Sequence, residues 1–257
     1  VTAHFRTASA TGPDLYLSPA TAGTVGGIAV TPQDILKLDG ATGAWSLYFD
    51  GSDVGVTKPI VAFAHLDDGD LLLAFKAKQV IPGAGTFAPQ DVARFSPVAP
   101  GDMTEGTFHW YFDGSDVGLQ GGREQIDALD ALPDGRLLIS TTGTAAVPGA
   151  GDALMAQDED LLSCTPTTLC EATVGTWELY LDGTSVPGMK REDVSGAAVD
   201  SAGDSYVALA GNFNIGGIKG NDKDILRLHP TGGGYSVVRY WHGPDDGFRL
   251  NIGGLEI

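Results

Sequence analysis

Aspartate is the most numerous ionisable side chain in this 257-residue chain. Two pairs, Asp158 with Asp160 and Asp222 with Asp224, are each separated by one residue and follow a Gly-containing segment. Carboxylates close together, with carbonyls from flexible backbone, are the ligands that calcium prefers. We therefore predict that calcium binds these pairs and further aspartates of the same loops: Asp113, Asp116, Asp50, Asp53, Asp34 and Asp91.

A structural interpretation competes with the metal site. Asp50, Asp113 and Asp182 each precede a glycine, and a short Asp side chain accepts hydrogen bonds from backbone N–H groups in turns. None of these segments matches the EF-hand loop or the Gly-Gly-x-Gly-x-Asp repeat. Turn capping and calcium binding both stay open at this point.

A second candidate site lies where the centre of the molecule is expected. His4 and His65 fall on segments predicted to be innermost strands, and Asp130 falls on a third. Imidazole nitrogens with a carboxylate can hold a transition metal. The alternative is an ordinary core histidine.

Cys164 and Cys170 are the only two cysteines. They are close in sequence, in a predicted loop, so we expect a disulfide between them. The alternative is two free thiols, as in a cytoplasmic protein.

A motif that recurs four times positions these side chains. Its copies begin at Trp45, Trp110 and Trp177, with a degraded copy at Tyr240. The spacing is about 60 to 70 residues, also when it is counted from the last copy through the chain ends to the first. The repeat therefore predicts a ring that accounts for the whole chain.

Each repeat contains four short segments rich in β-branched and aromatic residues, which predict strands. The first segments are residues 1–5, 60–65, 126–131 and 194–199, and the second are 15–17, 71–75, 137–140 and 206–209. A Gly-rich loop follows, as at 80–85. The third segment opens with an aligned aspartate, and the fourth contains the Trp motif.

Four antiparallel strands repeated radially predict an all-β, four-bladed β-propeller. It forms a single domain over residues 1–257, with blades at 1–50, 60–113, 126–182 and 194–257. So few blades leave a narrow axis, which the small residues Thr2, Ala62, Ala128 and Gly196 fit. Trp45, Trp110 and Trp177 are expected to pack between blades.

The net charge of −18 argues against partners that need a basic surface. Nucleic acids and anionic membrane surfaces both attract Lys and Arg. Solubility is the simplest explanation of the charge, yet more than half of the acids fall in loops that a propeller places on one face. No apolar run reaches the roughly 18 residues that cross a bilayer. The first residues have neither the basic start nor the apolar stretch of a signal peptide.

Three segments carry a resemblance to a known group of proteins. Residues 112–119 (FDGSDVGL), 132–139 (LPDGRLLI) and 158–162 (DEDLL) resemble a repeat of large, uncharacterised bacterial proteins that are exported. The resemblance covers the whole chain and implies a propeller-like structure and export. It implies no catalytic residues. The first repeat departs from it at residues 31–34, and the fourth has His242 where the others have aspartate.

The expected function is that of a non-enzymatic binding module, secreted or held at the bacterial surface or in the periplasm. It would be a monomer that binds calcium and a protein or glycan through its acidic face. The alternative is a hydrolase or lyase with a pocket at the channel mouth, because carboxylate pairs can cleave glycosides. The Ser-nucleophile elbow, the P-loop and the dinucleotide fingerprint are absent from the sequence.

Overall fold

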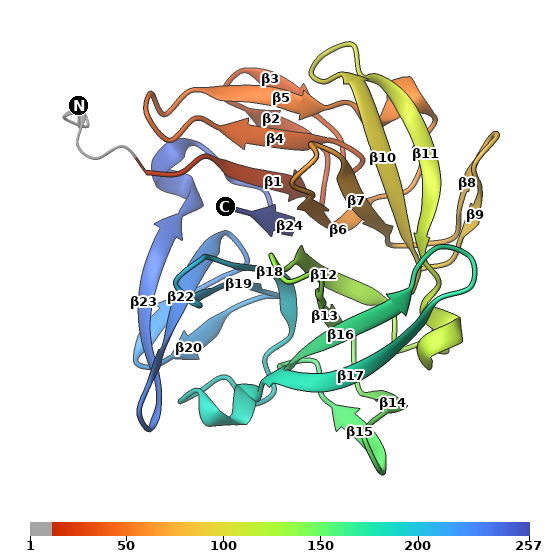
Figure 1. Cartoon of the computed structure of the whole chain (residues 1–257). Coiled ribbons are helices and arrows are strands. Elements are labelled where there is room, and N and C mark those ends of the chain that lie inside the picture. Colours follow the sequence, from red (N-terminus) through yellow and green to blue (C-terminus); the bar gives the residue numbers. More distant parts are fainter. Residues whose placement is uncertain (1–11) are drawn as a thin grey trace, which may run out of the picture.

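The computed structural model describes residues 12–257 and shows an all-β protein. Four sheets of four antiparallel strands surround a central axis as a four-bladed β-propeller (Figure 1). From the axis outward, blade 1 contains β24 (Ile252–Glu256), β1 (Leu15–Pro19), β4 (Ile35–Leu38) and β5 (Trp45–Phe49). Blade 2 contains β6 (Ile60–His65), β7 (Leu71–Phe75), β10 (Val92–Ala99) and β11 (Glu105–Phe112). Blade 3 contains β12 (Ile126–Ala131), β13 (Leu137–Thr141), β16 (Leu161–Thr168) and β17 (Val174–Leu181). Blade 4 contains β18 (Val194–Val199), β19 (Ser205–Leu209), β22 (Asp224–Thr231) and β23 (Gly234–His242).

The ring is closed by the C-terminal strand. β24 pairs with β1 in a register that places Glu256 opposite Tyr16 and Leu255 opposite Leu17. Residues 1–5, predicted to be the innermost strand of blade 1, lie outside the described residues, and β24 occupies that place in the sheet. The predicted boundary between the last and first blades is therefore wrong, because blade 4 ends with β23 and the segment after it enters blade 1.

Small residues allow the inner strands to meet at the axis. Ala62, Ala128, Gly196 and Gly254 occupy equivalent positions on β6, β12, β18 and β24. A Cβ atom on Gly254 would lie 3.2 Å from the Cα of Ala62, and one on Gly196 would lie 3.2 Å from Leu255. The prediction of a small residue at this position is confirmed for the three inner strands that were assigned correctly.

A small hairpin stands between the second and third strands of every blade, where the sequence predicts only a Gly-rich loop. The hairpins pair β2 (Gly23–Val25) with β3 (Ile28–Val30), β8 (Gln79–Ile81) with β9 (Gly85–Phe87), β14 (Ala145–Pro148) with β15 (Ala153–Ala156), and β20 (Phe213–Ile215) with β21 (Ile218–Gly220). The glycines supply the turns, since Gly26, Gly83 and Gly216 all have positive φ.

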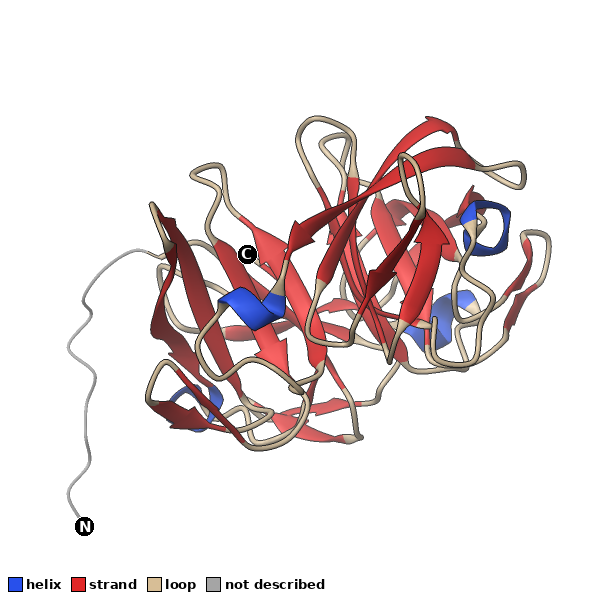
Figure 2. Ribbon diagram, turned by 90° about the horizontal axis from the view of Figure 1, so that it is seen from below, coloured by secondary structure: helices blue, strands red, loops and turns tan. Residues whose placement is uncertain are grey.

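Short 3-10 turns follow the outermost strands: η1 (Gly51–Val54), η2 (Gly114–Val117), η3 (Gly183–Ser185) and η4 (Gly243–Asp246). Figure 2 shows that apart from these turns the described chain is strand and loop. No helix within residues 12–257 is long and apolar enough to span a bilayer.

The hydrophobic core is divided among the four junctions between neighbouring blades. One cluster joins blades 1 and 2, and the others join blades 2 and 3, 3 and 4, and 4 and 1. Trp45 and Trp177 extend these contacts, since their Nε1–H groups donate to Asp246 O and Val117 O of the preceding blade, both at 2.8 Å. Trp110 packs against the cluster that joins blades 1 and 2, and its ring centroid lies 4.7 Å from that of Phe87 in its own blade.

Candidate functional site

All four inner strands carry a β-bulge at the same position. The pairing shifts by one residue next to Val61, Asp127, Ser195 and Gly253. A bulge turns a side chain out of the regular alternation of a strand, and bulges are frequent beside functional sites. Blades 3 and 4 therefore present polar side chains where blades 1 and 2 have Gly253 and Val61.

Four buried oxygens of the described chain that receive no hydrogen bond lie on β12 and β13 of blade 3 and at the start of β18 of blade 4. Among the described residues, Asp127 Oδ1, Ser140 Oγ, Asp193 Oδ1 and Ser195 Oγ are buried and have no partner. Asp127 is 8% exposed and Ser140 is 1% exposed. Their strands are neighbours, because β18 packs against both β12 and β13. Since an unpaired buried polar group costs about 1–3 kcal/mol, such a group points to a water, an ion or a ligand.

The two carboxyl groups of this cluster act on each other. Burial raises the pKa of Asp127 well above its ordinary value, and the charges of Asp193 and Asp158 add to the effect. Burial and the charge of Asp158 also raise the pKa of Asp193. The two groups are close enough to form a mutual hydrogen bond, but only when one of them carries a proton.

The loops that precede the third strands surround this end of the axis. The carbonyls of Pro32, Pro89, Asp158 and Asp222 each accept a hydrogen bond from the backbone N–H of the first residue of the next inner strand, at 2.8–3.1 Å. Blades 1 and 2 thus place proline at the mouth, whereas blades 3 and 4 place aspartate. Lys223 Nζ contacts Asp222 Oδ1 at 2.5 Å and Asn251 Oδ1 at 3.1 Å. Negative charge is therefore left in excess mainly at the junction of blades 3 and 4.

The aspartate that opens each third strand has a structural role. Each one accepts, through Oδ2, a backbone N–H three residues earlier at 2.7–2.8 Å: Asp34, Asp91, Asp160 and Asp224. In blades 1 to 3 the other oxygen accepts the N–H of the first glycine of the 3-10 turn, at 2.8 Å for Asp160 and Gly183. These carboxylates join the third strand to the end of the fourth.

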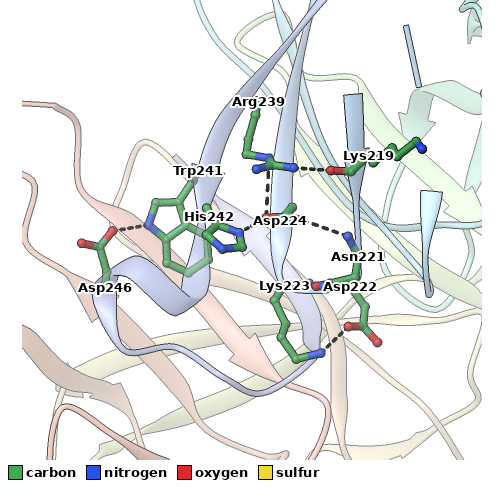
Figure 3. A network of polar contacts seen from close by, with 9 residues as sticks. All are labelled: Lys219, Asn221, Asp222, Lys223, Asp224, Arg239, Trp241, His242 and Asp246. Carbon is green, nitrogen blue, oxygen red and sulfur yellow. Dashed lines mark hydrogen bonds and ion pairs between the residues drawn. The ribbon is translucent and has the colours of Figure 1, made fainter. Parts of the chain in front are cut away.

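Blade 4 replaces one bond of this pattern with a histidine (Figure 3). His242 Nδ1 contacts Asp224 Oδ1, and Arg239 Nε lies 3.8 Å from the same oxygen. Gly243 N–H donates instead to Lys223 O at 2.9 Å. Trp241 Nε1–H donates to Asp246 Oδ2 at 2.7 Å. His242, which departs from the repeat, therefore retains the connection to the buried aspartate.

The aspartates of the Trp motif cap turns, as the structural interpretation predicts. Asp50, Asp113 and Asp182 accept the backbone N–H and the hydroxyl of the residue two positions later, at 2.6–3.0 Å. Asp53 and Asp116 accept backbone N–H groups of Thr104 and Thr173 in the next blade, at 2.9 and 3.0 Å. The two threonines, which sequence reasoning did not single out, also accept N–H groups of Asp50 and Asp113.

Calcium binding by the ten predicted aspartates stays a prediction. Within residues 12–257 no group of three or more His, Cys, Asp and Glu side chains is placed to hold a metal ion. Asp158 is the member of the predicted set that acts on the cluster at the blade 3–4 junction. Asp127 and Asp193 are not among the predicted calcium ligands, because nothing in the sequence indicates the bulge and the burial that distinguish them.

The second predicted site consists of His4, His65 and Asp130. His65 and Asp130 lie at the end of the inner strands opposite to the bulges. His4 lies outside the described residues. His65 packs edge-on against Tyr16 and Tyr48, at 4.6 and 5.3 Å between centroids, and burial lowers its pKa to about 4. Asp130 accepts the N–H groups of Ala131 and Val199, both at 2.7 Å, and burial raises its pKa to about 6.

Glu256 lies at the same end and is not among the residues predicted for the axial site. It occupies on β24 the position that Asp130 occupies on β12, and its buried Oε2 has no partner. Burial and the charge of Asp130 raise its pKa well above the ordinary value. The similarity of residues 252–256 (IGGLE) to residues 126–130 (IDALD) indicates the correspondence.

The predicted disulfide is wrong, because Cys164 and Cys170 are both free. Cys164 is buried in β16 opposite Trp177, whereas Cys170 follows the end of that strand and is exposed. An extended chain rises about 3.3 Å per residue, so the two cysteines are separated along the strand and do not meet across a tight loop.

A groove of about 610 Å³ lies at the outer edge of blade 2 rather than at the axial mouth. Residues of η1, of the β8–β9 hairpin and of β11 line it, including Asp53, Glu105 and His109. His109 Nε2 lies 3.3 Å from Thr107 Oγ1. The groove gathers no cluster of buried titratable groups.

No protein family and no curated protein matches this chain. Solved structures with a similar fold include "YCF48 bound to D1 peptide", at 12% identity and TM-score 0.34, which covers 86% of this chain and 50% of that one. A PQQ-bound aldose sugar dehydrogenase from Streptomyces coelicolor has 11% identity and TM-score 0.39, over 91% and 88% of the two chains. The extracellular domain of the putative one component system BT4673 from B. thetaiotaomicron has 11% identity and TM-score 0.31, over 91% and 29%. The chain thus spans half of the first structure and less than a third of the last, and likenesses of this size carry no functional argument.

Proposed function

We propose that this chain is a non-enzymatic binding module, exported and monomeric, that binds a positively charged ligand at the axial mouth between blades 3 and 4. The observation that carries the proposal is the set of unpartnered oxygens on Asp127, Ser140, Asp193 and Ser195. The ligand is a cation or a cationic group on a protein or glycan. Calcium on the acidic face belongs to the same proposal.

Two further observations support a ligand at this place. Most of the repeated aspartates accept hydrogen bonds from backbone N–H groups, so a structural role accounts for their presence. The junction cluster is different, since blades 1 and 2 form the same bulge with Gly253 and Val61. The net charge of −18 favours the approach of a cationic ligand at low salt.

The test uses a fluorescent decapeptide of lysine and serine, with a serine–glycine decapeptide as the neutral probe. Fluorescence anisotropy compares the natural chain with Asp127→Asn/Asp193→Asn and with Asp182→Asn, an exposed turn cap on blade 3. Binding of the basic peptide that is lost in the double variant and kept in Asp182→Asn supports the proposal. Equal binding by all three proteins would show that the basic peptide responds only to the net charge, which would contradict the proposal.

A hydrolase is the second candidate, because the polar cluster is asymmetric and contains paired carboxyl groups. In such an enzyme the protonated member of the Asp127–Asp193 pair would act as general acid and the other as base. Chromogenic glycosides and esters test this candidate. Turnover that Asp127→Asn abolishes and Asp182→Asn retains would replace the binding proposal with catalysis.

A further inference from the structure

We propose that the blade 3–4 junction binds one calcium-class cation, with Asp127 and Asp193 supplying carboxylates and Ser140 and Ser195 supplying hydroxyl oxygens. This inference rests on the proposed function and names the ligand of that site. It places the metal at residues other than the repeated Asp pairs of the loops.

The donor set indicates the class of metal. All four unpartnered atoms are oxygens, and hard cations such as calcium take oxygen ligands from carboxylates, hydroxyls, carbonyls and water. The cluster contains no imidazole or thiolate, which zinc and other transition metals prefer. Two carboxylates with two hydroxyls are also compatible with the absence of any three-membered His, Cys, Asp and Glu group among the described residues.

The polarity of the site is not required by the fold. Ser18 of blade 1 corresponds to Ser140 of blade 3, and its Oγ donates to Ile60 O of the next blade at 3.0 Å. Ser140 Oγ is equally buried yet makes no such bond. The bulge residues show the same contrast, because Val61 and Gly253 form the bulge without any polar atom.

The negative charge of Asp127 and Asp193 is not balanced by a neighbouring cationic side chain within residues 12–257. Neither Asp127 nor Asp193 forms an ion pair with Lys or Arg in the described part of the chain, and the charges that act on them are those of other aspartates. Buried carboxylates are ordinarily paired with a cation or a metal. A divalent ion would neutralise the two carboxylates and give partners to the serine hydroxyls.

Calcium alone is the probe. The chain is freed of metal with EDTA and dialysed, calcium is titrated by isothermal calorimetry, and bound metal is counted by atomic emission. The expected result is one calcium per chain, with affinity reduced at least about tenfold by Asp127→Asn and less by Ser140→Ala or Ser195→Ala. Asp182→Asn has the same change of charge and is expected to keep the affinity of the natural chain.

Two results would overturn the inference: no binding of calcium up to millimolar concentration, or equal binding by the natural chain and Asp127→Asn. The unfolding midpoint without metal shows that Asp127→Asn is folded, and the Ser195→Ala variant provides an independent test. The peptide assay in EDTA separates the two proposals. If calcium does not bind, peptide binding that persists in EDTA and depends on Asp127 and Asp193 would leave the proposed function intact and remove only the metal.

Discussion

Asp127 and Ser195 occupy the same bulge position on the inner strands of two adjacent blades, β12 and β18. Both have a buried side-chain oxygen without a partner. The fourfold scaffold thus supplies identical backbone at four places, and only two neighbouring blades use it to present polar atoms. An asymmetric site arises in a symmetric fold because the side chains differ while the bulges are retained.

The buried aspartate of each third strand is expected to stabilise the fold. Asp160→Ala removes the acceptor of two N–H groups, those of Gln157 and Gly183, each bonded at 2.8 Å. Two unpaired buried donors predict a loss of about 2–4 kcal/mol in the free energy of unfolding. Urea denaturation followed by Trp fluorescence measures it. The exposed cap variant Asp182→Ala is expected to lose about 1 kcal/mol or less, and equal losses would contradict the assignment.

Closure of the ring by β24 is tested by crowding its glycine. A Cβ atom on Gly254 would lie 3.1 Å from Ser18 Oγ and 3.2 Å from Ala62 Cα, so Gly254→Val is expected to destabilise the protein by about 1–3 kcal/mol. Thermal unfolding followed by circular dichroism measures the change. Gly151→Val is the control, because nothing lies within 4 Å of its added Cβ. If Gly254→Val unfolds at the same temperature as that control, β24 does not form the inner strand.

The repeat was sufficient to predict the propeller, the strand order within a blade and the small residues at the axis. It was not sufficient to decide which terminus supplies the inner strand of blade 1, because residues 1–5 and 252–256 both fit a short strand. The disulfide prediction is wrong because β16 continues to Thr168, so most of the segment from Cys164 to Cys170 is strand and not loop. Asp127 could not be distinguished from other acids, since a bulge depends on the pairing of two strands.

His65 is expected to make the protein sensitive to acid. Burial lowers its folded pKa from 6.5 to about 4, so the unfolded chain takes up the proton first. The stability contribution is complete above pH 6.5 and is lost as the pH falls toward 4, by up to about 3 kcal/mol. The His65→Phe variant is expected to lack this contribution to the loss of stability in acid. Urea denaturation between pH 7 and pH 4 measures the free energy of unfolding for both proteins. The control is His109→Phe on an exposed strand position, and parallel pH profiles for His65→Phe and the natural chain would exclude the effect.

The cysteines are expected to differ in reactivity. Cys170 is exposed, whereas Cys164 is buried and burial raises its pKa to about 12. Because the thiolate is the reactive form, Ellman's reagent is expected to label one thiol in the native protein and two after denaturation, without a reductant. A denatured chain with no free thiol would restore the disulfide.

A crystal structure grown in calcium, with anomalous diffraction data, shows whether the blade 3–4 junction holds a cation. We expect an anomalous peak bounded by Asp127, Asp193, Ser140 and Ser195, and no such peak in crystals of Asp127→Asn. A junction filled only by water, with any calcium located at the loop aspartates instead, would contradict this expectation.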